Sequence, residues 1–169
     1  MKEDIVLALD QSTSTTGWAL FIKGELKDHG AFTASGDREK RIEDMRQWLV
    51  EKIEELTLER QSPITLILEE IQHQRNVNTF RSLAHVQGVL INTGYQKELA
   101  NEVIKTEVYF ASEWKKTCGV TGRKSAEQKA NAQKFIRATY NIEVPQDTCD
   151  AICLGYHHTQ QKATELNFG

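Results

Sequence analysis

Near its N-terminus the chain reads Ile5-Val6-Leu7-Ala8-Leu9-Asp10-Gln11-Ser12-Thr13-Ser14-Thr15-Thr16-Gly17, and a second apolar run then extends from Trp18 to Ile22. Two short apolar runs on either side of a Ser/Thr-rich segment are typical of paired strands joined by a tight turn. The first run ends in the carboxylate of Asp10. We therefore expect a buried strand pair with an acid at the end of its first strand.

Two further segments place acids beside apolar elements. The run from Ile64 to Leu68 ends in Glu69 and Glu70, and Asp147 and Asp150 lie just before a third apolar segment. Carboxylates gathered in one place raise each other's pKa unless a cation neutralises them. If the three segments meet in the fold, they predict a divalent-metal site.

The spacing of the acids narrows the candidate set. Asp147 and Asp150 are three residues apart, which places them about 5–6 Å apart on one face of a helix. Capping of the helix N-terminus is the alternative interpretation of this pair, because acids are favoured near the positive helix end. Considered together with Asp10 and Glu69, metal binding is the favoured interpretation. Strand alternation sends Glu69 and Glu70 to opposite faces, so only one of them should enter the site.

Length and composition are typical of one globular domain spanning residues 1–169. A chain of 169 residues can bury a substantial core. No apolar stretch approaches the roughly 20 residues of a membrane span, and the N-terminus lacks a signal-peptide pattern. We therefore expect a cytoplasmic protein that does not contact a membrane. Its three cysteines are odd in number and are expected to stay reduced.

The charge is unevenly distributed. The net charge of −3 argues weakly against a nucleic-acid binder, but the segment from Lys115 to Arg137 carries seven basic residues and one acid, Glu127. Such a local excess suits contact with phosphates. On charge alone, a solvated helix face explains it equally well.

The pattern of apolar residues predicts an α/β fold, with helices on both faces of one sheet. Antiparallel strands are expected at residues 5–10, 17–23 and about 26–33, and further strands at 64–68 and within 102–110. Helices are expected at residues 38–60, about 78–100, 125–140 and about 147–161. Ser125 is the expected cap of the third helix, because Ser125 and Gln128 have capping-box spacing.

This order of elements, with acids ending the first and fourth strands and opening the last helix, resembles the RNase H-like nuclease superfamily and, within it, the RuvC family of Holliday-junction resolvases. The resemblance covers nearly the whole chain and implies an RNase H-like mixed sheet. It also implies a metal-dependent, structure-selective endonuclease that cuts four-way and other branched DNA. The motifs that carry it are Ala8-Leu9-Asp10 with Gly17, Leu68-Glu69 with Asn76 and Gly88, Trp114-Lys115, and Asp147-Thr148-Cys149-Asp150-Ala151.

The resemblance implies a two-magnesium site, with Mn²⁺ as a substitute. Two ions about 3.5–4 Å apart serve both oxygens of an in-line phosphodiester displacement. Asp10 would bridge both ions, Glu69 would hold one and Asp150 the other. Asp147 would complete the set or orient water. The family register, counted back from Asn76, favours Glu69 over Glu70.

The resemblance also implies DNA contacts. Lys115 matches a family lysine at the scissile phosphate, where an ammonium acts as a point charge. A second lysine is expected at Lys124 or Lys129. The loop 71–78 is expected to project towards the junction centre, but it lacks the aromatic residue common in the family. The residues expected to touch DNA are Gln72, His73, Arg75, Asn76, Lys116, Arg123, Lys124 and Lys129.

A homodimer is expected from the substrate. A four-way junction is nearly two-fold symmetric, so two matching nicks need two sites related by a symmetry axis. The helix at residues 78–100 is the candidate interface, although its apolar stripe suits packing on the sheet equally well.

Three alternatives compete with this hypothesis. The segment Leu9 to Thr15 resembles the phosphate-binding hairpin of actin-like sugar kinases, but the chain lacks the second domain and second hairpin of those enzymes. A branched-DNA-binding module without catalysis is disfavoured, because all four acids are present. Zinc binding by Cys149, Cys153 and His157 is disfavoured because they span about 12 Å of one helix. Packed cysteines and a half-exposed histidine are expected instead.

Overall fold

The computed structural model describes residues 2–169 as five strands and five helices in alternating groups. The sheet has the order β3-β2-β1-β4-β5, with β1–β2 and β2–β3 antiparallel and β1–β4 and β4–β5 parallel. The predicted mixed α/β sheet is thus confirmed. The strands are β1 (Ile5–Asp10), β2 (Thr15–Ile22), β3 (Glu25–Thr33), β4 (Ile64–Glu69) and β5 (Val103–Tyr109), and the helices are α1 (Arg38–Arg60), α2 (Val77–Leu99), α3 (Ala111–Thr117), α4 (Ser125–Tyr140) and α5 (Gln146–Phe168).

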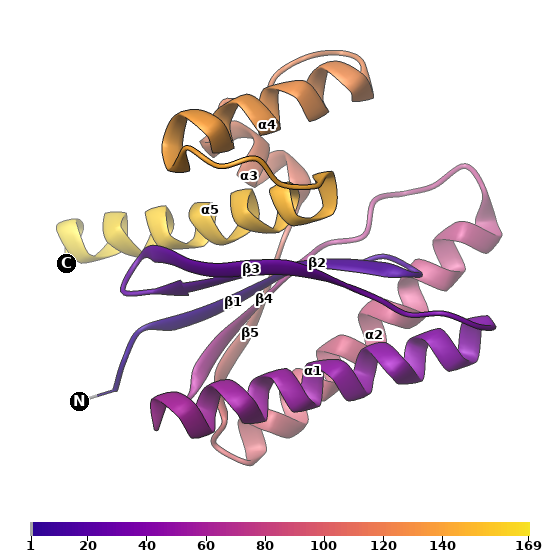
Figure 1. Cartoon of the computed structure of the whole chain (residues 1–169), viewed down its shortest axis with the longest axis vertical. Helices are drawn as coiled ribbons and strands as arrows, with labels where there is room; N and C mark the ends of the chain where they lie inside the picture. Colours follow the sequence, from indigo (N-terminus) through magenta and orange to yellow (C-terminus); the bar gives the residue numbers. More distant parts are fainter. Residues whose placement is uncertain (1) are drawn as a thin grey trace.

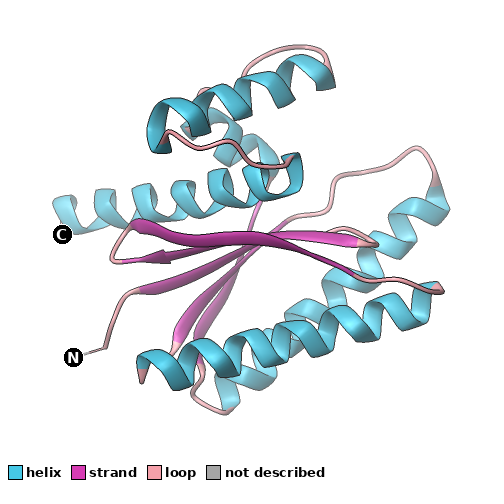
Figure 2. Cartoon of the chain, in the orientation of Figure 1, coloured by secondary structure: helices cyan, strands magenta, loops and turns pink. Residues whose placement is uncertain are grey.

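Helices cover both faces of the sheet. Helices α1 and α2 lie against one face, while α5 lies against the other with α3 and α4 stacked over it (Figures 1 and 2). The alternation of β1 explains both cores: Leu7 and Leu9 pack with α1, and Val6 and Ala8 pack with α5. None of the helices within residues 2–169 is long and apolar enough to cross a membrane.

The differences from the sequence-based expectations lie in the helices. The short helix α3 was not predicted; it buries only Ala111 and Trp114, too few for a periodic signal. Helix α4 begins at Ser125 itself after Lys124, so the predicted Ser125 cap is wrong. Helix α5 continues to Phe168 rather than residue 161, and its extra turns are exposed on all sides, which leaves no apolar stripe to predict them.

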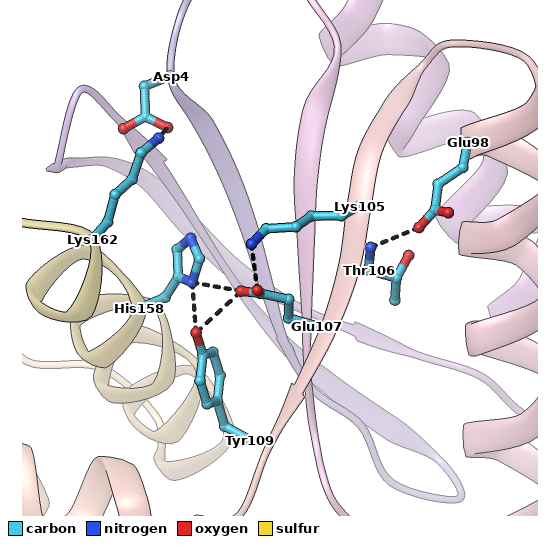
Figure 3. Close-up of polar contacts among 8 residues, drawn as sticks. All are labelled: Asp4, Glu98, Lys105, Thr106, Glu107, Tyr109, His158 and Lys162. Carbon is cyan, nitrogen blue, oxygen red and sulfur yellow. Dashed lines mark hydrogen bonds and ion pairs between the residues drawn. The ribbon is translucent and has the colours of Figure 1, made fainter. Parts of the chain in front are cut away.

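Polar contacts fix the far half of α5 on the sheet (Figure 3). His158 Nδ1 lies 2.9 Å from the Tyr109 hydroxyl and 3.1 Å from Glu107 Oε2, both on β5. Lys162 binds Asp4, which precedes β1, at 2.6 Å. These contacts set where α5 lies along the sheet, and therefore where its N-terminal turn meets β1 and β2.

That N-terminal turn contacts β2 at Gly17. A Cβ atom at Gly17 would lie 2.0 Å from the carbonyl oxygen of Asp147, and this backbone atom cannot turn aside as a side chain could. The glycine therefore permits the close approach of α5 to the strand pair.

We predict that Gly17→Ala destabilises the protein by about 1–3 kcal/mol, the usual cost of overpacking. Gly88→Ala is the matched control, because Gly88 is an exposed position within α2 where a Cβ meets no atom within 4 Å. This substitution should stabilise the protein by about 0.5–1 kcal/mol. Urea unfolding measures both. Equal midpoints for Gly17→Ala and the wild type would contradict the packing of α5 described above.

Candidate active site

Asp10 and Glu69 lie side by side where two parallel strands end. The register pairs Leu9 of β1 with Leu68 of β4, so the next residue on each strand is an acid. Each acid follows an α5-facing residue by two positions, Ala8 on β1 and Ile67 on β4. Both carboxyls therefore point to the α5 side of the sheet.

A pocket of about 180 Å³ opens at this point. Asp150, in the second turn of α5, brings a third carboxyl, and Gln146 Nε2 donates to its Oδ1 at 2.7 Å. The complete lining is Asp10, Glu69, Gln72, Trp114, Lys115, Val120, Ser125, Gln128, Lys129, Gln146 and Asp150. Asp147 does not line this pocket, although its charge still raises the pKa of Asp10 and Asp150.

Burial and mutual repulsion hold these carboxyls away from their ordinary titration range. Burial is the main cause that raises the pKa of Asp10 well above its usual value, and the charges of Glu69 and Asp150 add to it. Burial raises the pKa of Glu69 to about 7 and that of Asp150 to about 6. The Lys115 ammonium opposes both shifts. The pocket thus brings three carboxyls together with two lysines, Lys115 and Lys129.

The donor set suits a hard divalent cation, because carboxylate oxygens are the ligands such ions prefer. Within residues 2–169, however, no three His, Cys, Asp or Glu side chains converge closely enough to hold an ion as they stand. The site is thus a group of carboxyls around a pocket rather than a preformed coordination shell.

Glu69 and Glu70 differ in their surroundings. Glu69 lines the pocket with Asp150 and also an adjoining one of about 160 Å³, whereas Glu70 lines only the latter. The Glu70 carboxylate accepts the Ile71 N–H at 2.9 Å. Among the two glutamates, the structure brings Glu69 to the acid cluster.

Two of the candidate basic residues reach the pocket. Lys115 donates to Gln128 Oε1 at 3.0 Å, and Lys129, from α4, also lines the wall. Lys124 and its neighbour Arg123 are exposed just before α4 and do not line it. Lys116 lines a different pocket with Tyr109 and His157.

The predicted DNA-contacting loop lies beside the carboxyls. Gln72 lines both pockets, whereas the His73 ring packs on Phe80 with centroids 5.8 Å apart. Asn76 Oδ1 caps α2 by accepting the N–H groups of residues 78 and 79 at 2.9 and 3.1 Å, which leaves its Nδ2 free for other contacts. Arg75 is exposed.

Sequence reasoning missed the polar residues that support the acids. Gln11 and Gln146 bond to Glu69 and Asp150, respectively, and both directly neighbour motif residues, which was their only signal. The indole Nε1–H of Trp114 is buried without a partner that meets hydrogen-bond geometry, and its proximity favours the ionised form of Glu69.

The cysteines behave as expected, but one histidine does not. Cys118, Cys149 and Cys153 are free and buried in the core under α5. His157 is buried rather than half-exposed, because its Nδ1 bonds to Thr117 Oγ1 of α3 at 2.6 Å. The unpredicted helix α3 supplies the atoms that cover it.

Known proteins share this architecture. The structure of Thermus thermophilus RuvC in complex with a Holliday junction substrate superposes with a TM-score of 0.70 at 11% identity, covering 95% of this chain and 96% of that one. The yeast mitochondrial Holliday junction resolvase Ydc2 superposes with a TM-score of 0.61 at 11% identity, covering 96% of this chain and 80% of that one. At such identities the likeness concerns the fold.

Sequence comparison adds the family. Crossover junction endodeoxyribonuclease RuvC from Fusobacterium nucleatum is 25% identical over 97% of this chain and 84% of its own length. The protein of the same name from Dictyoglomus thermophilum is 24% identical over 93% of this chain and 98% of its own length. The protein-family model described as crossover junction endodeoxyribonuclease RuvC matches residues 7–158, which contain the whole carboxylate pocket. The chain therefore belongs to the RuvC family.

Proposed function

We propose that this protein is a divalent-metal-dependent endonuclease that resolves four-way DNA junctions by paired phosphodiester hydrolysis. The observation that carries the proposal is the single pocket that Asp10, Glu69 and Asp150 share with Lys115 in a chain of the RuvC family. The substrate class comes from the relatives, which are crossover junction endodeoxyribonucleases.

Magnesium is the proposed ion, two per site, with Mn²⁺ as a substitute. Asp10, Glu69 and Asp150 would hold it, and Asp147 would act from the rim of the cluster. Magnesium bound there supplies positive charge that offsets the carboxylates and stabilises the charge on the scissile phosphate. The convergence of three carboxyls on one pocket supports this assignment. Burial raises the pKa of all three, and a bound cation would favour their ionised forms.

The lysines divide into an inner and an outer group. Lys115 and Lys129 line the pocket and would bind the phosphate beside the carboxylates. Arg123 and Lys124 are exposed where α4 begins, so they would contact DNA backbone outside the pocket. The loop that bears Gln72, His73, Arg75 and Asn76 would meet the junction from the opposite side. Lys116, in a separate pocket, is the weakest member of the predicted DNA-contacting set.

A homodimer through α2 completes the proposal. The inner face of α2 buries Val86 and Leu90 on the sheet. Its outer face exposes Val77 (74%), Tyr95 (54%) and Leu99 (64%). The helix thus packs on the sheet and still presents an apolar stripe, which suits a two-fold interface.

The kinase-like alternative finds no support in the Ser/Thr-rich hairpin. A phosphate-binding hairpin needs free donors, but the Ser12 hydroxyl donates to Thr15 O at 2.5 Å and the Thr16 hydroxyl donates to Met45 Sδ at 3.0 Å. The Gln11 amide is turned towards Glu69. These three side chains therefore serve the fold and the acid cluster.

Glu69→Gln should change how stability depends on pH. The pKa of Glu69 is about 7 in the fold against an ordinary 4.5, so the carboxyl's contribution to stability falls as pH rises from 4.5 through about 7. In chelator at pH 8 we expect the melting temperature of the variant to exceed that of the wild type, by roughly 2–4 °C for each kcal/mol of unfolding free energy. Near pH 4.5 the two melting temperatures should be equal. Saturating Mg²⁺ should raise the melting temperature of the wild type more than that of Glu69→Gln. Calorimetric melts test this, and parallel pH curves in chelator would contradict it.

Cleavage of a labelled four-way junction tests the proposed activity. Asp10→Asn should abolish cleavage while junction binding persists, because the amide keeps the volume but cannot offset two cations. Glu69→Gln should lower the rate by about 10²-fold or more, whereas Glu70→Gln, the matched control, should change it little. Mg²⁺-dependent cleavage by Asp10→Asn at the wild-type rate, or the reverse ranking of the glutamates, would contradict the assignment.

The proposed interface predicts a change in mass. Tyr95→Glu places a charge in the apolar stripe and should convert the dimer to a monomer that still binds DNA but loses paired nicking. Light scattering after size-exclusion chromatography measures the mass. Thr164→Glu serves as a charge control, since Thr164 is exposed near the end of α5, away from α2. A wild-type monomer at micromolar concentration, or an unaffected Tyr95→Glu dimer, would rule out this interface.

A further inference from the structure

The strand ladder stops one residue short of the acid cluster. The β1–β4 pairing ends at Leu9 and Leu68, although Asp10 and Glu69 directly follow. On its other side Glu69 is paired with Tyr109 of β5. Glu70 N–H donates to Tyr109 O at 2.8 Å, so the main-chain groups of Glu69, one residue earlier, face β1, and its carbonyl oxygen lies beyond the last β1–β4 pair.

The side chain of Gln11 takes the place of the missing strand. Gln11 Nε2 donates to the Glu69 carbonyl oxygen at 2.5 Å, and the Glu69 N–H donates to Gln11 Oε1 at 3.3 Å. A primary amide carries both a donor and an acceptor, so it binds the carbonyl oxygen that the ladder leaves open and adds a longer bond to the Glu69 N–H. Gln11 is only 8% exposed, although it belongs to an otherwise polar turn.

A second amide reaches the same carbonyl. Gln87, on the inner face of α2, directs its Nε2 to Glu69 O at 3.4 Å and is also buried. Two side chains from different elements thus hold the main chain of one acid. The Ser12 hydroxyl bonds to Thr15 within the hairpin and the Thr16 hydroxyl to Met45 of α1, whereas the Gln11 side chain bonds to β4.

We infer that Gln11 is a positioning residue, whose side-chain amide fixes the main chain of Glu69 beside Asp10 against the repulsion between their carboxyls. This inference rests on the proposed function of the carboxylates. In this role Gln11 acts through the main chain of Glu69 rather than as a ligand of the metal or the phosphate. Residues that orient a metal ligand usually contribute 10- to 100-fold to metal affinity or activity, about the effect expected here.

The test compares Gln11→Met with the wild type, because methionine keeps the length and removes both hydrogen bonds. We expect single-turnover cleavage of a four-way junction to fall by about 10- to 100-fold and the Mn²⁺ affinity, measured by calorimetry without DNA, to fall in parallel. Junction binding in chelator should stay unchanged. Gln87→Met, which removes one longer bond, should produce the same pattern to a smaller extent.

Ile53→Val is the stability control, because Ile53 is fully buried in α1 away from the carboxylates. It should lower the melting temperature without changing Mn²⁺ affinity or the cleavage rate. If Gln11→Met folds and binds Mn²⁺ like the wild type, or loses activity only in proportion to its melting temperature, Gln11 is not a positioning residue. If Gln11→Met does not fold, wild-type Mn²⁺ affinity in Gln87→Met overturns the inference. Absence of cleavage by the wild type would instead refute the proposed function, while the Mn²⁺ titrations still decide the role of Gln11.

Discussion

The carboxyls of Asp10 and Glu69 meet at the ends of two adjacent parallel strands, where burial disfavours the charge of both and the charge of Glu69 raises the pKa of Asp10 further. Left to themselves, such groups would separate or stay protonated. The surrounding structure holds them together. Strand pairing aligns β1 and β4 up to Leu9 and Leu68, and the Gln11 amide continues that pairing to Glu69. A binding site for a divalent cation is the function that this arrangement of charge suits best.

The third carboxyl depends on the placement of a whole helix. Asp150 lies near the N-terminus of α5, and the far half of α5 is held to β5 and the start of β1 by His158 and Lys162 (Figure 3). Burial lowers the pKa of His158, so at physiological pH its imidazole is neutral and contacts β5 through a hydrogen bond. At the near end, Gly17 permits direct contact between β2 and the helix. Contacts at both ends of α5 therefore fix the position of Asp150 at the pocket.

Much of this could be predicted from the sequence because the signals were local. The strand at residues 5–10, the helix at residues 38–60 and the acids that follow apolar runs all have short-range patterns. The missed features are tertiary. Helix α3 has two buried residues and the end of α5 has none, so neither has an apolar pattern. Lys129 lines the pocket and Lys124 does not, which depends on how the start of α4 is oriented in the fold. Gln11 belongs to a motif that predicts a turn, and its contact is 58 residues away.

Anomalous diffraction from crystals of the protein grown or soaked in Mn²⁺ tests most directly whether Asp10 and Glu69 bind a common metal ion. A metal site at the ends of β1 and β4 should give a manganese peak in the pocket, with carboxylate oxygens of both Asp10 and Glu69 within coordination distance, about 2.0–2.6 Å. A peak coordinated by Glu70 instead of Glu69, or no peak at Asp10 under saturating Mn²⁺, would contradict it.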